Sequence, residues 1–144
     1  MPTPLTFEIH HKSKENAART GVVTTPHGSF KTPAFMPVGT RATVKGLTPS
    51  QVRSTGSEIL LNNAYHLALR PGDELIAKLG GVHKFMRWDR PILTDSGGYQ
   101  AWSMADINKL DEDGVTFKSI VDGSMIRITP ERSIDIQNNL GADI

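Results

Sequence analysis

Three short apolar runs alternate with helix signals along this chain, and that alternation limits the fold more than any other feature. The runs cover residues 33–40, 58–67 and 91–93, with helix signals between them at residues 48–56 and 73–79. Apolar strands that follow one another through helices normally pair in parallel, because parallel strands need a long crossover connection. We therefore predict an α/β fold built from βα units.

Several local signals agree on where helices begin and end. Thr48 and Gln51 match a capping box with Pro49 at the first helical position, and Gly56 is typical of a helix end. Gly80 and Gly81 follow residues 73–79 and predict the end of that helix. Thr129-Pro130 starts a third helix, which we expect to run to Gly141.

Two β-hairpins are expected outside the βα pattern. Residues 5–10 and 20–25 read as strands, and turn residues at 26–29 lead into a third extended segment, so an antiparallel element opens the chain. Residues 115–120 and 124–128 flank Asp122-Gly123, which is a strong signal for a two-residue hairpin turn. This second hairpin is an excursion from the βα order.

The last residues, Ala142-Asp143-Ile144, read as the start of a fourth strand of the parallel type. Three strands and part of a fourth cannot close an eight-stranded barrel. We expect either a fragment of a longer protein or an open sheet whose exposed edge needs a partner.

The composition excludes several classes of protein. The chain has 144 residues and no Cys, which excludes a disulfide framework, a thiolate nucleophile and a cysteine zinc site. The net charge of +1 does not indicate nucleic-acid binding by bulk charge. No apolar stretch approaches the roughly 18 residues that span a bilayer, and the first residues lack a signal-peptide pattern. We expect a cytoplasmic protein with no membrane contact.

The stretch that follows the third apolar run carries the clearest chemistry. Pro91-Ile92-Leu93 leads into Thr94 and then into Asp95-Ser96-Gly97-Gly98-Tyr99-Gln100. A buried strand of this kind delivers an acid and a hydroxyl to a site, and the two glycines let a ligand approach the backbone. Tyr99 adds a flat ring, and Gln100 adds a donor and an acceptor.

Asp-Ser-Gly-Gly alone leaves other interpretations open. It also occurs in aspartic protease half-sites, where two such loops share a proton, and around the nucleophile of trypsin-like proteases. The helix signals oppose the first, and the absence of Cys and of a suitable His opposes the second. A plain strand-to-helix turn remains a structural interpretation of the motif.

Other polar and aromatic residues give weaker signals. No His-Glu-x-x-His or comparable metal pattern occurs among the five His residues, so no metal site is predicted. His66 stands at a strand end, where a structural role is favoured over a place in a site. Trp88 and Trp102 are interpreted as packing residues on either side of the central stretch.

Several stretches in the same order resemble the bacterial tRNA-guanine transglycosylases, the queuine tRNA-ribosyltransferase family. The resemblance runs from about residue 20 to the end and is carried by Thr32–Thr40, Thr43–Gly46, Asn63–Gly72, Ile92–Gln100, Glu112–Phe117, Asp122-Gly123 and Thr129–Ile134. The combination is highly specific, although the motifs are individually short.

The resemblance implies a fold and a reaction. The family fold is an irregular (β/α)8 TIM barrel preceded by an antiparallel β element, which assigns residues 1–32 to that element and 33–144 to the first βα units of an incomplete barrel. Members are glycosyltransferases that exchange guanine in the tRNA anticodon loop for the 7-deazaguanine base preQ1, on the way to queuosine. The implied partners are tRNA and the guanine or preQ1 base.

The resemblance also assigns roles to residues. It implies that Asp95 is the proton-accepting catalytic acid/base and a base-binding carboxylate. Ser96, Gly97, Gly98 and Tyr99 continue the base-binding loop, and Tyr99 stacks on the base. Residues 38–40 and 62–63 are expected at neighbouring strand ends on the same face.

Two departures from the family limit what the resemblance implies. Asn62 stands where the family usually has Gly. The family's covalent nucleophile and its zinc site lie downstream of residue 144, so we expect this chain alone to bind no zinc and to be inactive. The alternative is a non-catalytic truncated homologue that acts as a partner subunit, either in a homodimer or beside a full-length chain.

Overall fold

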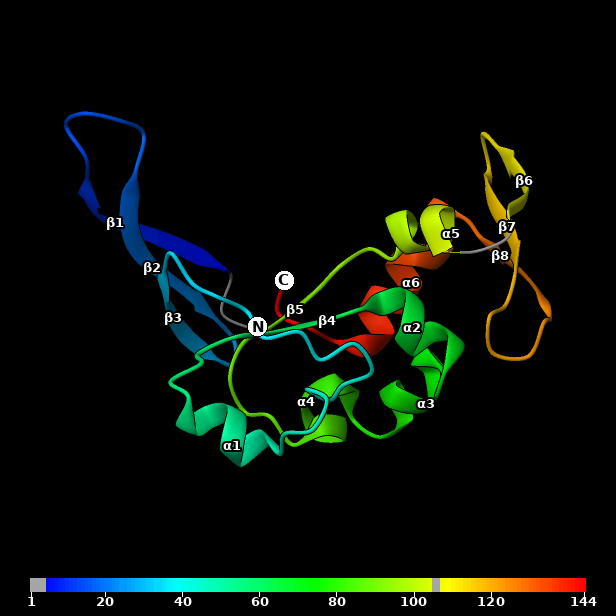
Figure 1. Cartoon of the computed structure of the whole chain (residues 1–144), viewed down its shortest axis with the longest axis horizontal. Helices are drawn as coiled ribbons and strands as arrows, with labels where there is room; N and C mark the ends of the chain where they lie inside the picture. Colours follow the sequence, from blue (N-terminus) through cyan, green and yellow to red (C-terminus); the bar gives the residue numbers. More distant parts are fainter. Residues whose placement is uncertain (1–4, 105–106) are drawn as a thin grey trace.

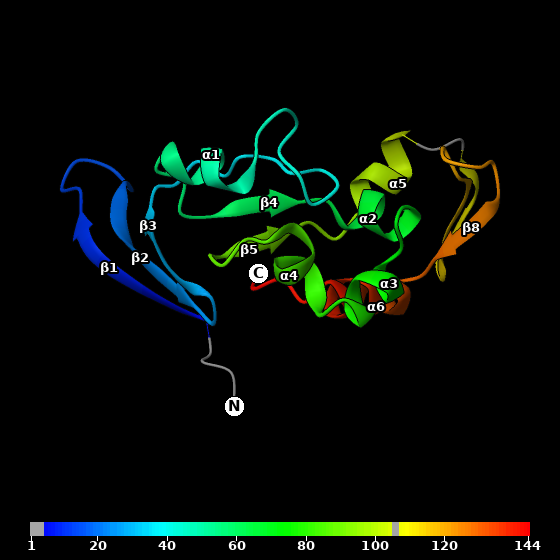
Figure 2. The ribbon, with the colours of Figure 1, turned by 90° about the horizontal axis from the view of Figure 1, so that it is seen from below.

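The computed structural model describes residues 5–104 and 107–144 (Figure 1). It is a mixed α/β structure in which two antiparallel sheets lie at opposite ends of a central part made of short parallel strands and helices (Figure 2). The described residues contain no closed barrel. Among them, no helix has the length and apolar character needed to cross a membrane.

The first sheet confirms the predicted antiparallel opening of the chain. Its strands are β1 (Thr6–Lys12), β2 (Arg19–Thr25) and β3 (Gly28–Thr32), paired in the order β1-β2-β3. All residues of β1 are exposed, whereas Phe30 of β3 is buried. The sheet therefore contacts the rest of the protein through β3 and the β2–β3 turn.

The central strands are β4 (Leu60–Asn62) and β5 (Ile92–Thr94), which pair in parallel as predicted. The predicted strand at 33–40 is reduced to a parallel bridge between Val38 and Leu61. Prolines at 33 and 37 explain the difference, because proline has no N–H to donate to a ladder.

The end of the chain lies beside β5 in the manner of a parallel strand. The Ile144 carbonyl accepts from the Thr94 N–H at 2.8 Å, and the Asp143 N–H donates to the Ile92 carbonyl at 2.9 Å. The expectation of a fourth extended segment at this position is thus met by its hydrogen bonds. The parallel order becomes residues 37–38, β4, β5 and 143–144.

The apolar run 58–67 is shorter as a strand than predicted. The strand ends at Asn62, and Ala64–Leu69 form helix α2. A continuous apolar run does not distinguish a buried strand from a buried helix, and this run contains both. Tyr65 and Leu67 of α2 are buried, which explains the apolar sequence.

Three predicted helices are present, and α2 is joined by further helices that were not predicted. Helices α1 (Pro49–Ser54), α3 (Asp73–Lys78) and α6 (Pro130–Leu140) occupy their predicted places, and the capping box of Thr48 and Gln51 is formed. Helix α6 ends at Gly141 with φ +64°. Helix α4 (Gly81–Met86) was not predicted, because the two glycines read only as an end signal.

The last sheet extends the predicted second hairpin. Strands β7 (Gly114–Lys118) and β8 (Met125–Ile128) are antiparallel, with β6 (Ile107–Asp111) on the other side of β7. The connection is not the predicted two-residue turn, because residues 119–124 lie between the two strands. Across this longer connection the Ser119 N–H donates to the Ser124 carbonyl at 2.8 Å. Helix α5 (Gly98–Met104) precedes this sheet.

One main core joins the central strands to the helices. It contains buried residues of α1, α2, α3, α4, α6, β4 and β5, including Val52, Leu60, Leu67, Ile76, Val82, Trp88, Ile92, Ile136 and Leu140. Trp88 packs as predicted, and its indole N–H donates to the Pro91 carbonyl at 3.2 Å. Trp102 does not, since its exposed fraction is 59%.

Candidate functional site

The site forms where β4 and β5 end side by side. Asp95 follows β5 directly, and its backbone N–H donates to the Asn62 carbonyl at the end of β4 at 3.3 Å. Asn63 is the residue that follows β4 and precedes α2. The parallel pairing therefore places the side chains of Asn63 and Asp95 at one edge of the sheet, as polar groups at the ends of parallel strands are expected to lie.

Three donors hold the Asp95 carboxylate. Its Oδ1 accepts from the Ala64 N–H at 2.8 Å, and its Oδ2 accepts from the Asn63 amide at 2.5 Å and the Gln100 amide at 2.6 Å. These bonds reach the carboxylate from the residue after β4, from α2 and from α5, and they fix its orientation. Asp95 is half-buried.

Gly97 is fixed in place by its neighbours. Its φ is +76°, and a Cβ added there would lie 2.9 Å from the Tyr65 backbone nitrogen. Glycine is therefore required, both for the backbone conformation and for the close approach to α2. Ser96 is anchored by its carbonyl, which accepts from the Ser133 hydroxyl of α6 at 2.8 Å.

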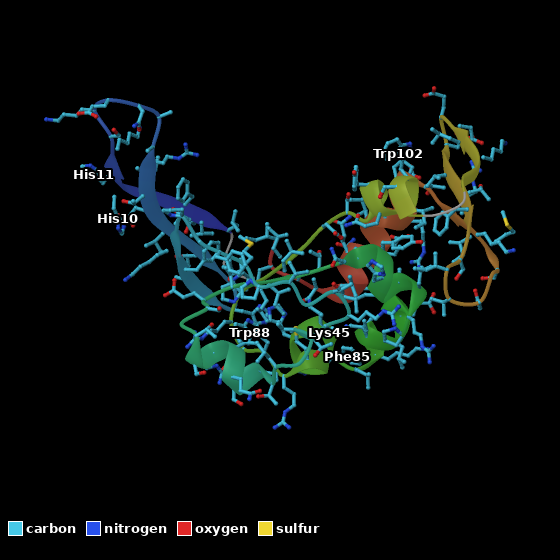
Figure 3. All side chains as sticks on the ribbon, viewed as in Figure 1. His10, His11, Lys45, Phe85, Trp88 and Trp102 are labelled. Atoms are coloured by element: carbon cyan, nitrogen blue, oxygen red, sulfur yellow. The ribbon has the colours of Figure 1, made fainter. Side chains whose placement is uncertain are left out.

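Gly98 and Tyr99 do not belong to a loop, as the sequence suggested, but open helix α5. A helix can start here because Ala101 N–H donates to the Gly97 carbonyl at 3.0 Å. Tyr99 has an exposed fraction of 72%, and its ring centroid lies 5.8 Å from that of Trp102. Figure 3 shows Trp102 on α5, far from His10 and His11 on β1. The helix thus presents two aromatic rings to solvent close after Asp95.

His66 extends the polar part of the site. Burial and the positive charge of Arg41 lower the pKa of His66, and the negative charge of Asp95 opposes this shift. His66 therefore lies within the electrostatic reach of Asp95 and Arg41, which the sequence did not reveal. The sequence did point to residues 62–63 at this edge, but not to Asn63 and Gln100 as donors to Asp95.

Asn62 is buried behind the site. Its amide donates to the Gly39 carbonyl, and a Cβ on Gly39 would approach that amide nitrogen to 2.9 Å. Among the described residues its Oδ1 has no hydrogen-bond partner. Asn62 therefore connects the end of β4 to residue 39, so the expected neighbours at 38–40 and 62–63 do meet.

The two parallel strands define an α/β protein. Their carboxyl ends, with a held acid and amide donors, form a candidate ligand site at the sheet edge. Residues 13–144 match the family described as Queuine tRNA-ribosyltransferase. The chain belongs to this family of pentosyltransferases, which confirms the resemblance seen in the sequence.

The similarity to individual relatives is close. The chain is 56% identical over 141 residues to a queuine tRNA-ribosyltransferase of Streptococcus suis, and 57% identical over 141 residues to one of Streptococcus uberis. Each match covers 98% of this chain and 37% of the relative. The chain therefore spans 37% of the length of these relatives and corresponds to their N-terminal portion.

Proposed function

We propose that this chain forms the base-recognition part of a tRNA-guanine transglycosylase, which exchanges guanine in the tRNA anticodon loop for preQ1. The observation that carries the proposal is the Asp95 carboxylate, held by three donors at the sheet edge and followed four residues later by the exposed ring of Tyr99. Family membership supplies the reaction. Because the proposed substrate is tRNA, we propose that the protein acts in the cytoplasm.

Asp95 suits the binding of a purine edge. A guanine edge carries N–H donors, and a carboxylate accepts from two neighbouring donors. Asn63 and Gln100 keep the carboxylate oriented while the base adds its own N–H donors, because an ionised carboxylate has about four acceptor positions. In the exchange, Asp95 takes up and returns a proton of the base.

Tyr99 and the glycine turn would complete the pocket. Stacking of a base on an aromatic side chain contributes about 1–3 kcal/mol. Ser96, Gly97 and Gly98 offer backbone groups without bulky side chains, so a flat ring can lie close to the chain. Base exchange also requires that the target base leave its stack in the RNA, and an exposed ring at the rim can receive it.

The parallel strands support a partial (β/α)8 barrel. Residues 37–38, β4, β5 and 143–144 follow one another in space in chain order, and helices lie between them in sequence. This is how successive strands enter a TIM barrel. We assign residues 1–32 to the preceding β element and 33–144 to the first βα units of one catalytic domain.

The catalytic nucleophile and the family's zinc ligands are assigned to sequence downstream of residue 144. The 144-residue chain alone is therefore inactive in base exchange. A chimera supplies the missing part: residues 1–144 replace the matching segment of the Streptococcus suis relative. We expect the chimera to incorporate labelled guanine into tRNA and the chain alone to incorporate none.

Three results would contradict this proposal. They are a folded chimera without incorporation, turnover by the isolated chain, and stable association of the isolated chain with a full-length subunit that activates the subunit. The last would instead support a non-catalytic partner subunit, the alternative that the open parallel edge allows.

A further inference from the structure

Two histidines share one buried carboxylate at the end of β5 opposite to Asp95. His27 Nδ1 lies 2.7 Å from Asp143 Oδ1, and His83 Nε2 lies 3.0 Å from Asp143 Oδ2. The exposed fraction of the Asp143 side chain is 1%, that of His83 8% and that of His27 42%. The three residues come from the β2–β3 turn, from α4 and from the segment after α6, and are distant in sequence.

Asp143 also fixes the start of β5, because its Oδ2 accepts from the Ile92 N–H at 3.0 Å. His27 belongs to the turn of the first sheet, close to where Gly28 approaches Pro91. The cluster therefore connects three parts of the protein: the first sheet, helix α4 and the parallel strands.

These are metal-ligating residue types, but their geometry does not suit a metal. The rings of His27 and His83 are stacked, with centroids 3.6 Å apart and planes 15° apart. The lone pair of an imidazole nitrogen lies in the plane of its ring, and Zn–N bonds are about 2.0–2.1 Å long. Because the two ring planes are nearly parallel and a stacking distance apart, one cation cannot lie in the plane of both rings. The arrangement instead suits two ring N–H groups that donate to one carboxylate.

We propose that His27, Asp143 and His83 form a proton-sensitive clasp, which fastens the β2–β3 turn to the amino end of β5 and opens when both imidazoles are protonated. With both rings neutral, each donates one N–H to Asp143. One added proton gives an imidazolium beside the carboxylate. A second places two positive charges on stacked rings with one acid between them.

Three charged groups on α4 and ahead of β5 have other neighbours than the clasp. Lys84 of α4 folds back against Gly80. Before β5, Asp89 pairs with Arg53, and the Arg90 guanidinium donates to the Ser57 carbonyl. The backbone of Gly141 interacts with the His83 ring and favours its protonation. Asp143 therefore supplies the negative charge that both rings share.

The ionisation of the buried pair agrees with this arrangement. Burial lowers the pKa of His83 and the neighbouring His27 lowers it further, against the opposing effect of Asp143. Burial opposes ionisation of Asp143, but the hydrogen bond from His27 and the Ile92 N–H keep its pKa below the ordinary value. The folded state disfavours the protonated form of His83. The stabilisation by the neutral His83 ring is therefore present above the pKa that His83 has in the unfolded chain, and it is lost as pH falls through the lower pKa of His83 in the folded protein.

Hydrogen exchange of the 144-residue chain tests the clasp. Protection of the segment 25–30 is measured at pH 7.5 and pH 5.5, after correction for the intrinsic pH dependence of exchange. We expect protection to fall several-fold on acidification, because protonation of the buried His83 ring is disfavoured in the closed clasp. His83→Gln keeps an N–H donor that does not titrate and should remove most of this fall. His11→Gln, at an exposed histidine of β1, should behave as the unmodified chain.

A second measurement needs no variant. In an NMR titration of the unmodified chain, the ring nitrogens of His83 should titrate below the ordinary histidine value, and amide signals of the β2–β3 turn should shift at the same pH. Titration of His83 at the ordinary value without a response of the turn would overturn the proposal. An equal pH dependence of protection in the His83→Gln chain and in the unmodified chain would also overturn it. The same holds for binding of one equivalent of Zn²⁺ that is abolished by Asp143→Asn and retained in His11→Gln.

Discussion

The side-chain amide of Asn63 donates a hydrogen bond to Oδ2 of Asp95 at 2.5 Å and joins the ends of two neighbouring parallel strands. The bond orients the carboxylate that we assign to base recognition. Asn63 approaches from the end of β4, and Gln100 approaches the same oxygen from α5. The position of Asp95 is therefore set by the pairing of β4 with β5 and by the start of α5.

Removal of the Asn63 amide should weaken base exchange without unfolding the protein. A hydrogen bond to a charged group contributes about 1.5–3 kcal/mol. We expect Asn63→Ala in the chimera to lower kcat/KM for labelled guanine by roughly 10- to 100-fold. Asn138→Ala, at an exposed position of α6, serves as the control. An unchanged kcat/KM for Asn63→Ala would show that the Asn63 amide does not position Asp95.

The two neighbouring glycines should respond in opposite ways to alanine. At Gly97, φ is +76° and a Cβ would lie 2.9 Å from the Tyr65 nitrogen, whereas at Gly98 the nearest atom is Ser96 Oγ at 3.7 Å. We expect Gly97→Ala to lower the free energy of unfolding by about 1–3 kcal/mol. Gly98→Ala should be neutral or stabilising by up to about 1 kcal/mol, because Gly98 lies in a helix. Urea unfolding of both variants measures the difference, and equal losses would contradict the geometry.

The Asp73 carboxylate predicts a loss of stability in acid. Burial opposes ionisation of Asp73, but hydrogen bonds from Arg132 at 2.6 and 3.0 Å and from Asn139 at 2.6 Å outweigh it and lower its pKa. A carboxyl with a lowered folded pKa stabilises the protein above its unfolded pKa of about 3.9, and the contribution is lost as pH falls through the folded value.

Urea unfolding at pH 6 and pH 3 measures this contribution. Asp73→Asn should destabilise the chain at pH 6 by about 2 kcal/mol, the scale of a hydrogen bond to a charged group. It should also lose less stability than the unmodified chain on going to pH 3. Glu74→Gln changes the exposed neighbouring acid and should leave the pH dependence unaltered. A pH dependence of Asp73→Asn equal to that of the unmodified chain would exclude Asp73 as its source.

The sequence predicted those parts of the fold that local chemistry determines. Thr48 and Gln51 form their capping box, Gly141 ends α6, and β5 leads into Asp95 as its apolar run indicated. Backbone hydrogen bonding decides these features within a few residues, so the pattern is sufficient. The parallel pairing of β4 and β5 followed from the order of strands and helices.

The features that were wrong or missed depend on contacts distant in sequence. The run 58–67 divides into β4 and α2, and the Ala64 N–H at the start of α2 donates to Asp95, the residue that follows β5. His27, His83 and Asp143 show no pattern along the chain and meet only in the folded protein. Trp102 was interpreted as a packing residue beside the central stretch, but on α5 its side chain is exposed to solvent.

Loss of the Asp95 carboxylate is the most direct test of the proposed function. In the chimera, Asp95→Ala should retain the circular dichroism spectrum and thermal transition of the folded protein. Its rate of labelled guanine incorporation into tRNA should fall by at least about 100-fold, the lower end of what a general acid/base contributes. Asp89→Asn, at an exposed acid ahead of β5, should retain activity. Near-normal incorporation by a folded Asp95→Ala chimera would contradict the role assigned to Asp95.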